Sequence, residues 1–341
     1  MPDENDAAAT RQLSFNAAIQ LALQTEMKRD PRVILFGIGI HHGANFRSLA
    51  EEFGRERLFQ APIAEQGFTC AALGAAIMGY RPVVVIGRGD FLYCAMDSIA
   101  NEAAKYRYIC GGGKFRVPMV IRVNSTGMGG GEGSQHSQSV EASFMHIPGL
   151  KIAIPATPAD AVGLFRTAVR DDNPVLFFEH RQLKRSKKTD EVPLDPDFLV
   201  PLGKAAIRRR GADATIVTYA YMLEKSLAAA EQLAGQGIEA EVIDLRSLSP
   251  WDKQTVLDSV GRTGRLIVVS EDCKTGGVGA EIAATVSEDG FRSLKAPIQR
   301  VCYPDMIVPG TVYGESLFMI QVKDIVNGVQ RAMEESPSKN K

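Results

Sequence analysis

The 341-residue sequence has little net charge, few cysteines and no long apolar run. A formal net charge of −1 gives no bulk attraction to nucleic acid or to an anionic membrane. A spanning helix needs about 18 consecutive apolar residues, and because no such run occurs we expect no membrane association. The five cysteines are scattered without a CxxC pair, which argues against a disulfide framework or a zinc site. The acidic, polar N-terminus is typical of neither a secretory signal nor a transit peptide, so a cytoplasmic location is predicted.

Signatures of phosphate binding are also missing. The glycine-rich stretch "STGMGGGEG" (125–133) follows a predicted strand, but it contains neither GxxxxGK[ST] nor GxGxxG. This excludes a P-loop and a Rossmann fingerprint. His136 follows in "QHSQS" (135–139), at the carboxyl end of the strand, where open α/β sheets bind their ligands. A histidine in a surface loop is the simpler alternative.

What the sequence does contain is a regular alternation of buried strands and helices. Short apolar runs predict strands over 32–37, 81–87, 117–123, 151–155 and 174–179, with helices over 14–30, 64–79, 95–109 and 160–171. After a charged stretch without periodicity (184–200), strands over 214–219, 239–243, 265–270 and 298–302 alternate with helices over 222–235, 251–260, 277–288 and 321–334. The pattern predicts an α/β protein with two doubly wound, mainly parallel domains. We expect a disordered N-terminus (1–13), a first domain (14–183), a linker (184–205) and a second domain (206–335), with the last residues disordered.

The helix predicted over 64–79 contains a single acid, Glu65, in its first turn. An acid in a first turn commonly just interacts with the helix dipole, which is worth about 0.3–1 kcal/mol. The same helix carries a ridge of minimal side chains at every fourth position: Gly67, Ala71, Ala75 and Gly79. Glycine within a helix costs about 1 kcal/mol relative to alanine, so the ridge indicates close packing on another helix, within the chain or across a subunit interface. Glu65 would then lie at the end of a tightly packed helix–helix contact, away from bulk water.

Three further segments are weaker candidates. Phe91 and Tyr93 offer flat faces to an aromatic ligand, although they fit the role of core aromatics equally well. The adjacent His41 and His42 make a poor chelate, so metal binding by them is not expected. The strand–loop–helix junction over 271–282 suits either an anion or a tight turn.

Taken together, several stretches resemble the beta subunit of thiamine diphosphate-dependent 2-oxo acid dehydrogenases, within the transketolase superfamily. Pyruvate, branched-chain and acetoin dehydrogenases belong to this family, and the last two look most similar. The matching stretches run in order from about residue 14 to 330: "APIAEQGF" (61–68), "AALGAAIMGYRP" (71–82), "MDSIANEAAKYRY" (96–108), "HSQS" (136–139), "PGLKIAIPATPADAVGLFRTAVRDDNPVLFFE" (148–179), "AEVIDLRSLSPWD" (240–252), "TGRLIVVSE" (263–271) and "TGGVGAEIA" (275–283).

The resemblance implies a pyrimidine-binding domain followed by a transketolase C-terminal-type domain, and it implies roles for individual residues. Glu65 matches the glutamate that hydrogen-bonds N1′ of the aminopyrimidine, which lets the cofactor's own 4′-nitrogen take the proton from C2. Phe91 matches an aromatic residue against that ring, and Gln66 and Gly87 fall among the cofactor-binding positions. His136 matches the histidine that assists the keto substrate and acyl transfer.

The resemblance also implies a structural monovalent cation such as K⁺, bound mainly through backbone carbonyls. The matching positions are Met119, Ala168, Asp171 and Asn173.

One motif of the superfamily is missing, and this absence implies a partner. The GDG…N motif that holds the diphosphate and its Mg²⁺ does not occur in this chain. The resemblance therefore implies an alpha subunit that carries the GDG motif, in an α2β2 heterotetramer that shares thiamine diphosphate between the chains. The implied reaction is decarboxylation of a 2-oxo acid, or cleavage of acetoin, with transfer of the acyl or aldehyde unit to a lipoyl acyltransferase core.

The chain departs from the family pattern at a few positions. Ile38 and Val85 stand where family members usually carry acids of a buried chain linking paired sites. Arg88, in the altered "GRGD" loop (87–90), is either a partner for a substrate carboxylate or a surface arginine. These departures leave three alternatives open: a divergent thiamine diphosphate enzyme of a specialised pathway, a non-catalytic scaffold for an alpha chain, and a split transketolase.

Overall fold

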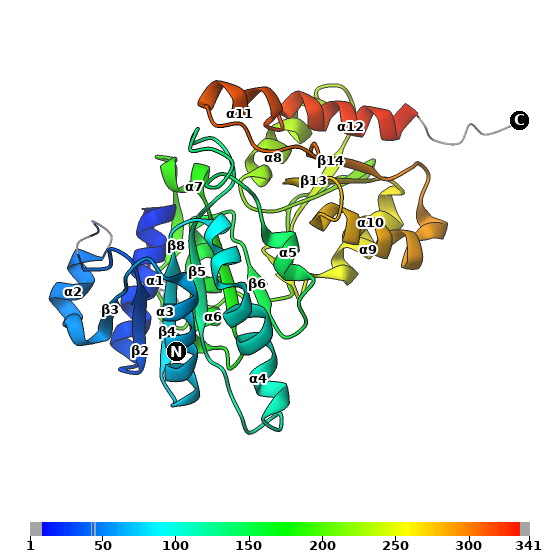
Figure 1. Cartoon of the computed structure of the whole chain (residues 1–341). Coiled ribbons are helices and arrows are strands. Elements are labelled where there is room, and N and C mark those ends of the chain that lie inside the picture. Colours follow the sequence, from blue (N-terminus) through cyan, green and yellow to red (C-terminus); the bar gives the residue numbers. More distant parts are fainter. Residues whose placement is uncertain (1–8, 42, 44–45, 335–341) are drawn as a thin grey trace, which may run out of the picture. The chain divides into compact units, whose positions relative to one another are not determined.

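The computed structural model describes residues 9–41, 43 and 46–334, which divide into two units (Figure 1). The first unit comprises Met1–Ser125 and Ile147–Leu202, and the second comprises Thr126–His146 and Gly203–Lys341. Each unit is built around a mainly parallel sheet, as the alternating pattern predicts. The α/β class predicted from the sequence is therefore confirmed for both units.

The first unit contains most of the elements predicted for the first domain, together with several short ones. Its strands are β1 (Thr10–Ser14), β2 (Val33–Gly37), β3 (Leu58–Gln60), β4 (Arg81–Ile86), β5 (Val120–Thr126), β6 (Lys151–Ala153), β7 (Val175–His180) and β8 (Thr189–Pro193). Its helices are α1 (Phe15–Arg29), α2 (Arg47–Phe53), α3 (Glu65–Ile77), α4 (Ala104–Ile109), α6 (Pro158–Arg170) and α7 (Arg181–Arg185), with shorter turns η1 (Arg55–Arg57), η2 (Gly89–Ala95) and η3 (Asp97–Ala103).

Six strands of the first unit follow the order β6-β7-β5-β4-β2-β3 in one sheet. Strands β2 and β4 are buried almost throughout, which explains their continuous apolar sequences. Helix α1 packs against α6, and α3 packs against β4. Both long helices start at side-chain caps, because Ser14 accepts from the Ala17 N–H and Thr157 accepts from the Asp160 N–H. Each cap satisfies one of the backbone N–H groups that are left free at the start of a helix.

Two predicted elements differ from the structure in position or type. The strand predicted over 117–123 is β5, which starts three residues later, because Pro118 lacks an N–H and the Met119 N–H bonds the Val117 carbonyl in a local turn. The single helix predicted over 95–109 is instead the π-helical segment η3 followed by the short α4. The buried Ser98 ties η3 to α3 through its hydroxyl and the Gln66 carbonyl, 3.0 Å apart, where a regular helix was expected.

The N-terminus and the linker also contain regular structure that the sequence did not predict. Residues 10–13, expected to be disordered, belong to β1, which pairs antiparallel with β8 inside the expected linker. The ladder supplies hydrogen bonds to both backbones, and Leu13 and Val192 provide its buried side chains. A five-residue strand with one or two apolar positions gives too weak an alternation to be detected in a sequence.

The second unit agrees closely with the elements predicted for the second domain. Its strands are β9 (Ala206–Arg209), β10 (Ala214–Thr218), β11 (Ala240–Asp244), β12 (Ser247–Ser249), β13 (Leu266–Cys273) and β14 (Gln299–Tyr303). Its helices are α5 (Glu141–Met145), α8 (Met222–Ala234), α9 (Lys253–Thr263), α10 (Val278–Asp289), α11 (Val312–Phe318) and α12 (Val322–Glu334), with the turn η4 (Phe291–Ser293). The sheet has the order β14-β13-β10-β11-β9, in which only β9 is antiparallel to its neighbour. Helices α8 and α12 cover one face, and α9 and α10 cover the other (Figure 1).

Segment 126–146, which the sequence assigned to the first domain, groups with the second unit. Met128 joins a buried apolar cluster with Tyr303 and Val308, and Glu315 accepts hydrogen bonds from the glycines that follow Met128. These contacts link residues more than 170 positions apart, so local sequence patterns could not predict them. The consequence is that the loop bearing His136 is held by the second unit.

Some predictions fall on residues that lie outside the described part of the chain. These are the disorder expected at residues 1–8 and 335–341, and His42 of the histidine pair. Within the described ranges, no helix combines the length and the apolar character that crossing a bilayer requires.

Candidate active site

Helix α3 places Glu65 at its first position, where the predicted burial is observed. Glu65 is only 8% exposed, and the preceding Ala64 provides no side-chain cap. Among the described residues, none donates a hydrogen bond to the Glu65 carboxylate. The helix terminus therefore presents a largely desolvated carboxyl group whose hydrogen-bonding capacity is left for a ligand.

The residues predicted to bind the cofactor beside Glu65 gather around the start of α3. Helix α3 packs against η2, which carries the half-buried Phe91, and against η3. The Gln66 side chain donates to Asp97 Oδ2 at 3.2 Å, which fixes it on the η3 side. The carbonyl of Gly87 accepts from Arg88 Nη1 at 3.0 Å, so one end of the Arg88 guanidinium lies against its own loop.

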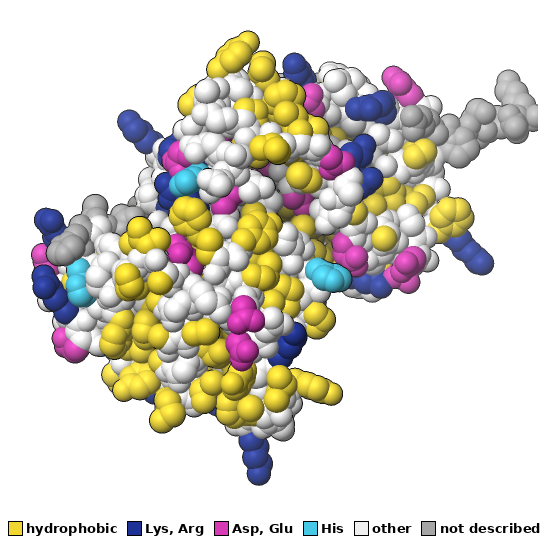
Figure 2. Space-filling model, in the orientation of Figure 1, with side chains coloured by type: hydrophobic (Ala, Val, Ile, Leu, Met, Phe, Trp, Pro, Cys, Tyr) yellow, Lys and Arg dark blue, Asp and Glu magenta, His cyan; other side chains and the backbone are white. Residues whose placement is uncertain are grey.

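The small-residue ridge of α3 lies on the surface of this chain. Gly67, Ala71 and Gly79 are exposed, and a Cβ built on Gly74 would meet no atom within 4 Å among the described residues. No close packing within the described part of the first unit therefore explains Gly67 or Gly74, whereas Gly79 has a φ of 98°, which favours glycine. Figure 2 shows apolar side chains gathered over α3 and α4, where Met78 and Tyr108 are 79% and 88% exposed. The exposed ridge is compatible with the predicted packing across a subunit interface.

Ile38 and Val85, where the resemblance led us to expect acids, have different environments. Val85 is buried in β4, and a Cβ on the neighbouring Gly37 would lie 2.9 Å from the Val85 carbonyl oxygen. Ile38, at the end of β2, is 40% exposed. The strands pack closely at this point with an aliphatic side chain in place of an acid.

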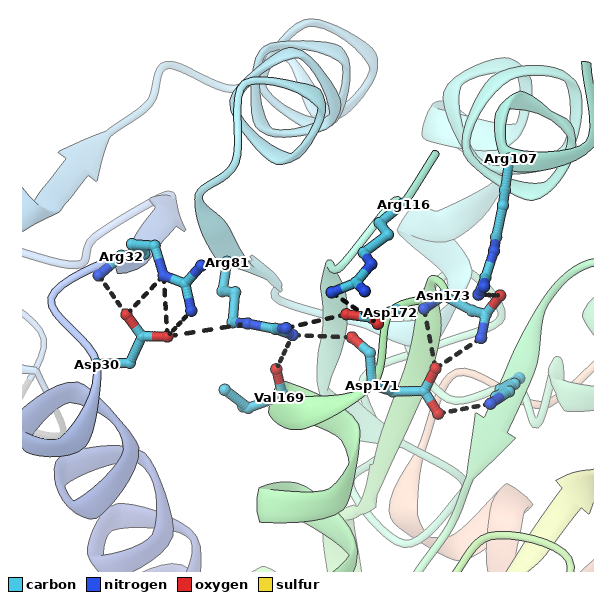
Figure 3. A network of polar contacts seen from close by, with 10 residues as sticks. Asp30, Arg32, Arg81, Arg107, Arg116, Val169, Asp171, Asp172 and Asn173 are labelled. Carbon is cyan, nitrogen blue, oxygen red and sulfur yellow. Dashed lines mark hydrogen bonds and ion pairs between the residues drawn. The ribbon is translucent and has the colours of Figure 1, made fainter. Parts of the chain in front are cut away.

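Three of the residues predicted to bind a monovalent cation lie in one turn at the end of α6, where Figure 3 shows Asp171 and Asn173. The carbonyl of Ala168 accepts from the Asp171 N–H at 3.3 Å. Asp171 Oδ1 accepts from both the backbone N–H and the side-chain amide of Asn173, at 2.9 and 2.7 Å. The fourth residue, Met119, lies outside this turn, and its carbonyl accepts from the Val175 N–H at 2.9 Å, two residues after Asn173.

Positively charged side chains surround this turn. Arg81 Nη1 donates to the carbonyls of Val169 and Asp171 at 2.9 and 3.0 Å, and Lys151 pairs with Asp171 Oδ2 at 2.5 Å. Burial raises the pKa of Asp171, but the bonds from Lys151 and Asn173 outweigh it and hold the pKa below its usual value. Each carbonyl oxygen keeps a second lone pair, so a cation can still bind through the backbone.

The loop between β5 and α5 carries His136, which is half-buried, and the His136 N–H donates to the Gly133 carbonyl at 3.0 Å. The far end of the loop is fixed by Thr126. Its hydroxyl lies 3.1 Å from both the Gln138 carbonyl and Glu141 Oε1. The histidine is thus presented by an irregular but well-bonded segment of the second unit.

The glycine-rich part of this loop does bind an anion, but the anion is a side chain of the chain itself. The backbone N–H groups of Gly129, Gly130 and Gly131 all donate to Glu315 Oε2, at 2.6, 2.9 and 3.0 Å. Glu315 is fully buried on α11. The sequence has no phosphate-binding signature at these glycines, and no local pattern pointed to an acid 184 residues later.

Three buried acids, Glu141, Glu271 and Asp272, lie near one another in the second unit. Burial, together with the charges of Asp272 and Glu271, raises the pKa of Glu141 to about 8. Burial likewise raises the pKa of Asp272, against the bonds from Ser270 and the Val278 N–H. Glu141 is therefore mainly neutral at pH 7. Sequence reasoning missed this cluster because its members come from α5 and β13.

The fold and these sites define a two-unit α/β protein with a buried carboxyl group at a helix terminus. Family models agree with this description: the transketolase pyrimidine binding domain matches residues 11–187, and the transketolase C-terminal domain matches residues 203–325. The chain belongs to the family of 2-oxo acid dehydrogenase beta subunits, within the transketolase superfamily, as its relatives establish.

Three relatives illustrate the membership. The pyruvate dehydrogenase E1 component subunit beta of Bacillus subtilis is 40% identical over 95% of this chain and 99% of its own length. The 2-oxoisovalerate dehydrogenase subunit beta of the same organism is 41% identical, with the same coverage. The acetoin:2,6-dichlorophenolindophenol oxidoreductase subunit beta of Cupriavidus necator is 40% identical over 95% of this chain and 98% of its own. Their nearly equal identities do not favour one substrate.

A solved structure described as a split gene transketolase, an inactive beta4 tetramer, has the same fold. Its TM-score to this chain is 0.77, and the match covers 96% of this chain and 100% of that one. At 23% identity the match shows the fold alone. The sequence relatives, which are about 40% identical, place the chain with the dehydrogenase beta subunits.

Proposed function

We propose that this chain is the beta subunit of a thiamine diphosphate-dependent enzyme that decarboxylates a 2-oxo acid, or cleaves acetoin, and passes the acyl or aldehyde unit to a lipoyl acceptor. The observation that carries the proposal is Glu65, a buried carboxyl group on the terminus of α3, in a chain that matches dehydrogenase beta subunits over 95% of its length. The relatives' names supply the reaction class, and Glu65 supplies a group suited to the cofactor.

In this proposal Glu65 holds a proton at N1′ of the aminopyrimidine. When bound, thiamine diphosphate supplies the electron sink for breaking the bond to the departing carboxylate. A carboxyl group with 8% exposure and no donor among the described residues has its oxygens left for a hydrogen bond to the ring. Phe91 contacts the ring, and Gln66 and Gly87 complete the binding segment on α3 and η2.

His136 has the second chemical role. It holds or donates a proton at the keto oxygen of the substrate and supports acyl transfer. The hydrogen bonds at both ends of its loop support this role, because they limit the positions that the imidazole can adopt.

An alpha subunit completes the proposed enzyme as an α2β2 heterotetramer. The sequence has no GDG motif, so we assign the diphosphate and Mg²⁺ to an alpha chain that carries it. The exposed glycine–alanine ridge of α3 and the exposed Met78 and Tyr108 supply a suitable interface. A lipoyl acyltransferase core is the proposed acceptor complex.

Circular dichroism on the reconstituted pair tests this proposal. Adding thiamine diphosphate to this chain mixed with a GDG-bearing alpha chain is expected to produce an aminopyrimidine or imino signal that saturates with cofactor. Neither chain alone is expected to produce it, because each holds only part of the cofactor. If the mixture assembles without any such signal, the chain is a scaffold and the proposal fails.

We further propose that K⁺ binds at the end of α6, through Ala168, Asp171 and Asn173 of the turn and through Met119. The complex is expected to melt at a higher temperature in potassium chloride than in choline chloride, because an ion that binds only the folded state stabilises it by mass action. Asp171→Ala should abolish this difference, since Asp171 Oδ1 holds the Asn173 backbone and side chain.

Asp172→Asn is the matched control for the cation site. Asp172 pairs with Arg81 and Arg116 and accepts no bond from Asn173, so its replacement should preserve the potassium effect. A wild-type melting temperature that is equal in the two salts would contradict the assignment.

A further inference from the structure

Glu315 is the feature of the second unit that the proposed function leaves unexplained. It is an acid with no measurable exposure, on the two-turn helix α11, and its charge is balanced by backbone N–H groups of a distant loop. Burying a carboxylate costs free energy unless several hydrogen-bond donors satisfy it, so the burial of Glu315 calls for an explanation.

We infer that Glu315 is a positioning residue for His136: its carboxylate fixes the glycine-rich loop from which the histidine is presented. This inference rests on the proposed role of His136. It concerns the residues over 127–138 and one side chain of α11, all within the second unit.

Hydrogen bonds link the glycine-rich loop directly to Glu315. Three consecutive N–H groups, of Gly129, Gly130 and Gly131, converge on a single oxygen, Glu315 Oε2, within 3.0 Å. Successive N–H groups that point to one centre form a cradle for an anion, and bonds to a charged acceptor are stronger than neutral ones. One carboxylate oxygen therefore holds the backbone of all three residues.

The backbone conformation of the loop also depends on its glycines and on α11. Gly129 and Gly131 have φ values of 96° and 64°, which side chains rarely adopt. A Cβ on Gly131 would also lie 2.7 Å from the Val312 backbone nitrogen, so the loop lies directly against the start of α11. The conformation of the loop thus depends on glycine at positions 129 and 131 and on the close approach of α11.

His136 lies only a few residues along the chain from the glycines that bind Glu315. The Gly133 carbonyl accepts from the His136 N–H at 3.0 Å, and only one residue separates Gly131 from Gly133. Displacement of the cradle therefore displaces the turn on which His136 lies. A shift of about 1 Å in a catalytic group can lower the rate about 10²-fold.

The other carboxylate oxygen of Glu315, Oε1, takes no part in the cradle. It is buried, as is the hydroxyl of Tyr303, and neither has a hydrogen-bond partner among the described residues. Glu315 therefore acts on the loop through Oε2 alone.

Hydrogen exchange and a mutant cycle on the complex with the alpha chain test the inference. Glu315→Ala is expected to increase amide exchange over 127–138 by roughly tenfold or more, because the three N–H groups lose their acceptor. It should also lower kcat for 2-oxo acid decarboxylation by about 10²-fold while the Kd for thiamine diphosphate changes less than twofold.

Glu315→Gln keeps an oxygen acceptor without the charge, so both effects should be intermediate. Glu231→Ala, at an exposed acid of α8, is the control and should change neither.

The double variant separates a positioning role from a general loss of structure. If Glu315 acts through His136, then Glu315→Ala combined with His136→Ala loses no more activity than His136→Ala alone. Unchanged exchange over 127–138 in Glu315→Ala and Glu315→Gln overturns the inference, and so do losses that multiply in the double variant. If Glu315→Ala does not assemble, the exchange and kcat of Glu315→Gln decide in the same way. Failure of the proposed function is distinct: the wild-type complex would then release no CO₂ from any 2-oxo acid, whatever the exchange over 127–138.

Discussion

Glu65→Gln is expected to lower the rate of 2-oxo acid decarboxylation by the assembled complex by about 10²–10⁴-fold, the usual contribution of a positioned acid or base. Glutamine has nearly the same shape as glutamate, but it cannot hold a transferable proton at N1′. The loss should be in kcat, because the amide can still make a hydrogen bond to the ring. The measurement is CO₂ release at saturating substrate and cofactor.

The same substitution should have little effect on folding. Glu65 accepts no hydrogen bond among the described residues, so the folded chain loses only the interaction with the helix dipole, about 0.3–1 kcal/mol. Glu281→Gln is the matched control, because Glu281 is an exposed acid in the first turn of α10 and loses the same dipole interaction. Activity within twofold of wild type in Glu65→Gln would contradict the proposed role.

Glu141→Gln is expected to stabilise the protein at pH 8 and above, and to leave its stability at pH 4 almost unchanged. The unfolded chain releases the Glu141 proton near pH 4.5, whereas the folded chain retains it up to about pH 8. The wild-type free energy of unfolding therefore falls as the pH rises through this interval, by up to about 5 kcal/mol. Glutamine does not titrate and so avoids this loss.

Denaturant unfolding of wild type and Glu141→Gln between pH 5 and 8.5 measures the effect. The two curves should diverge as the pH rises, and the wild type should be the less stable at the alkaline end. Thr126→Ser is a suitable control, since it keeps the hydroxyl that lies 3.1 Å from Glu141 and changes no titrating group. Parallel curves for wild type and Glu141→Gln would show that Glu141 is ionised in the folded protein.

Much of the fold could be predicted from the sequence because parallel strands and their covering helices have strong local signals. The strand β4 is an unbroken apolar run, and α6 begins at a capping threonine followed by proline. In the second unit each long helix and each parallel strand was predicted within a few residues. These elements are determined by burial and capping, which are both visible within a short window.

The elements that were missed depend on partners distant in sequence. Strand β1 exists because β8 pairs with it, and the π-helical segment η3 is tied to α3 through Ser98. The grouping of 126–146 with the second unit depends on Glu315 and on the apolar contacts of Met128. None of these contacts has a signature near the residues that make it.

The candidate site, like the fold, could be predicted only in part from the sequence. The burial of Glu65 followed from the small, apolar helix around it, but its proposed chemistry came from the resemblance and not from that pattern. The carboxylates that hold the His136 loop, Glu315 and Glu141, could not be inferred, because one is contributed by a helix far along the chain and the other gains its raised pKa from burial. Site-supporting residues of this kind are revealed only by three-dimensional contacts.

The most direct test of the central claim is the release of CO₂ from a panel of 2-oxo acids by this chain, by a GDG-bearing alpha chain, and by the two together with thiamine diphosphate and Mg²⁺. We expect turnover of at least one 2-oxo acid by the mixture only, and its loss when the mixture contains Glu65→Gln. A mixture that forms a stable complex and binds thiamine diphosphate, yet turns over xylulose 5-phosphate and no 2-oxo acid, would contradict the account.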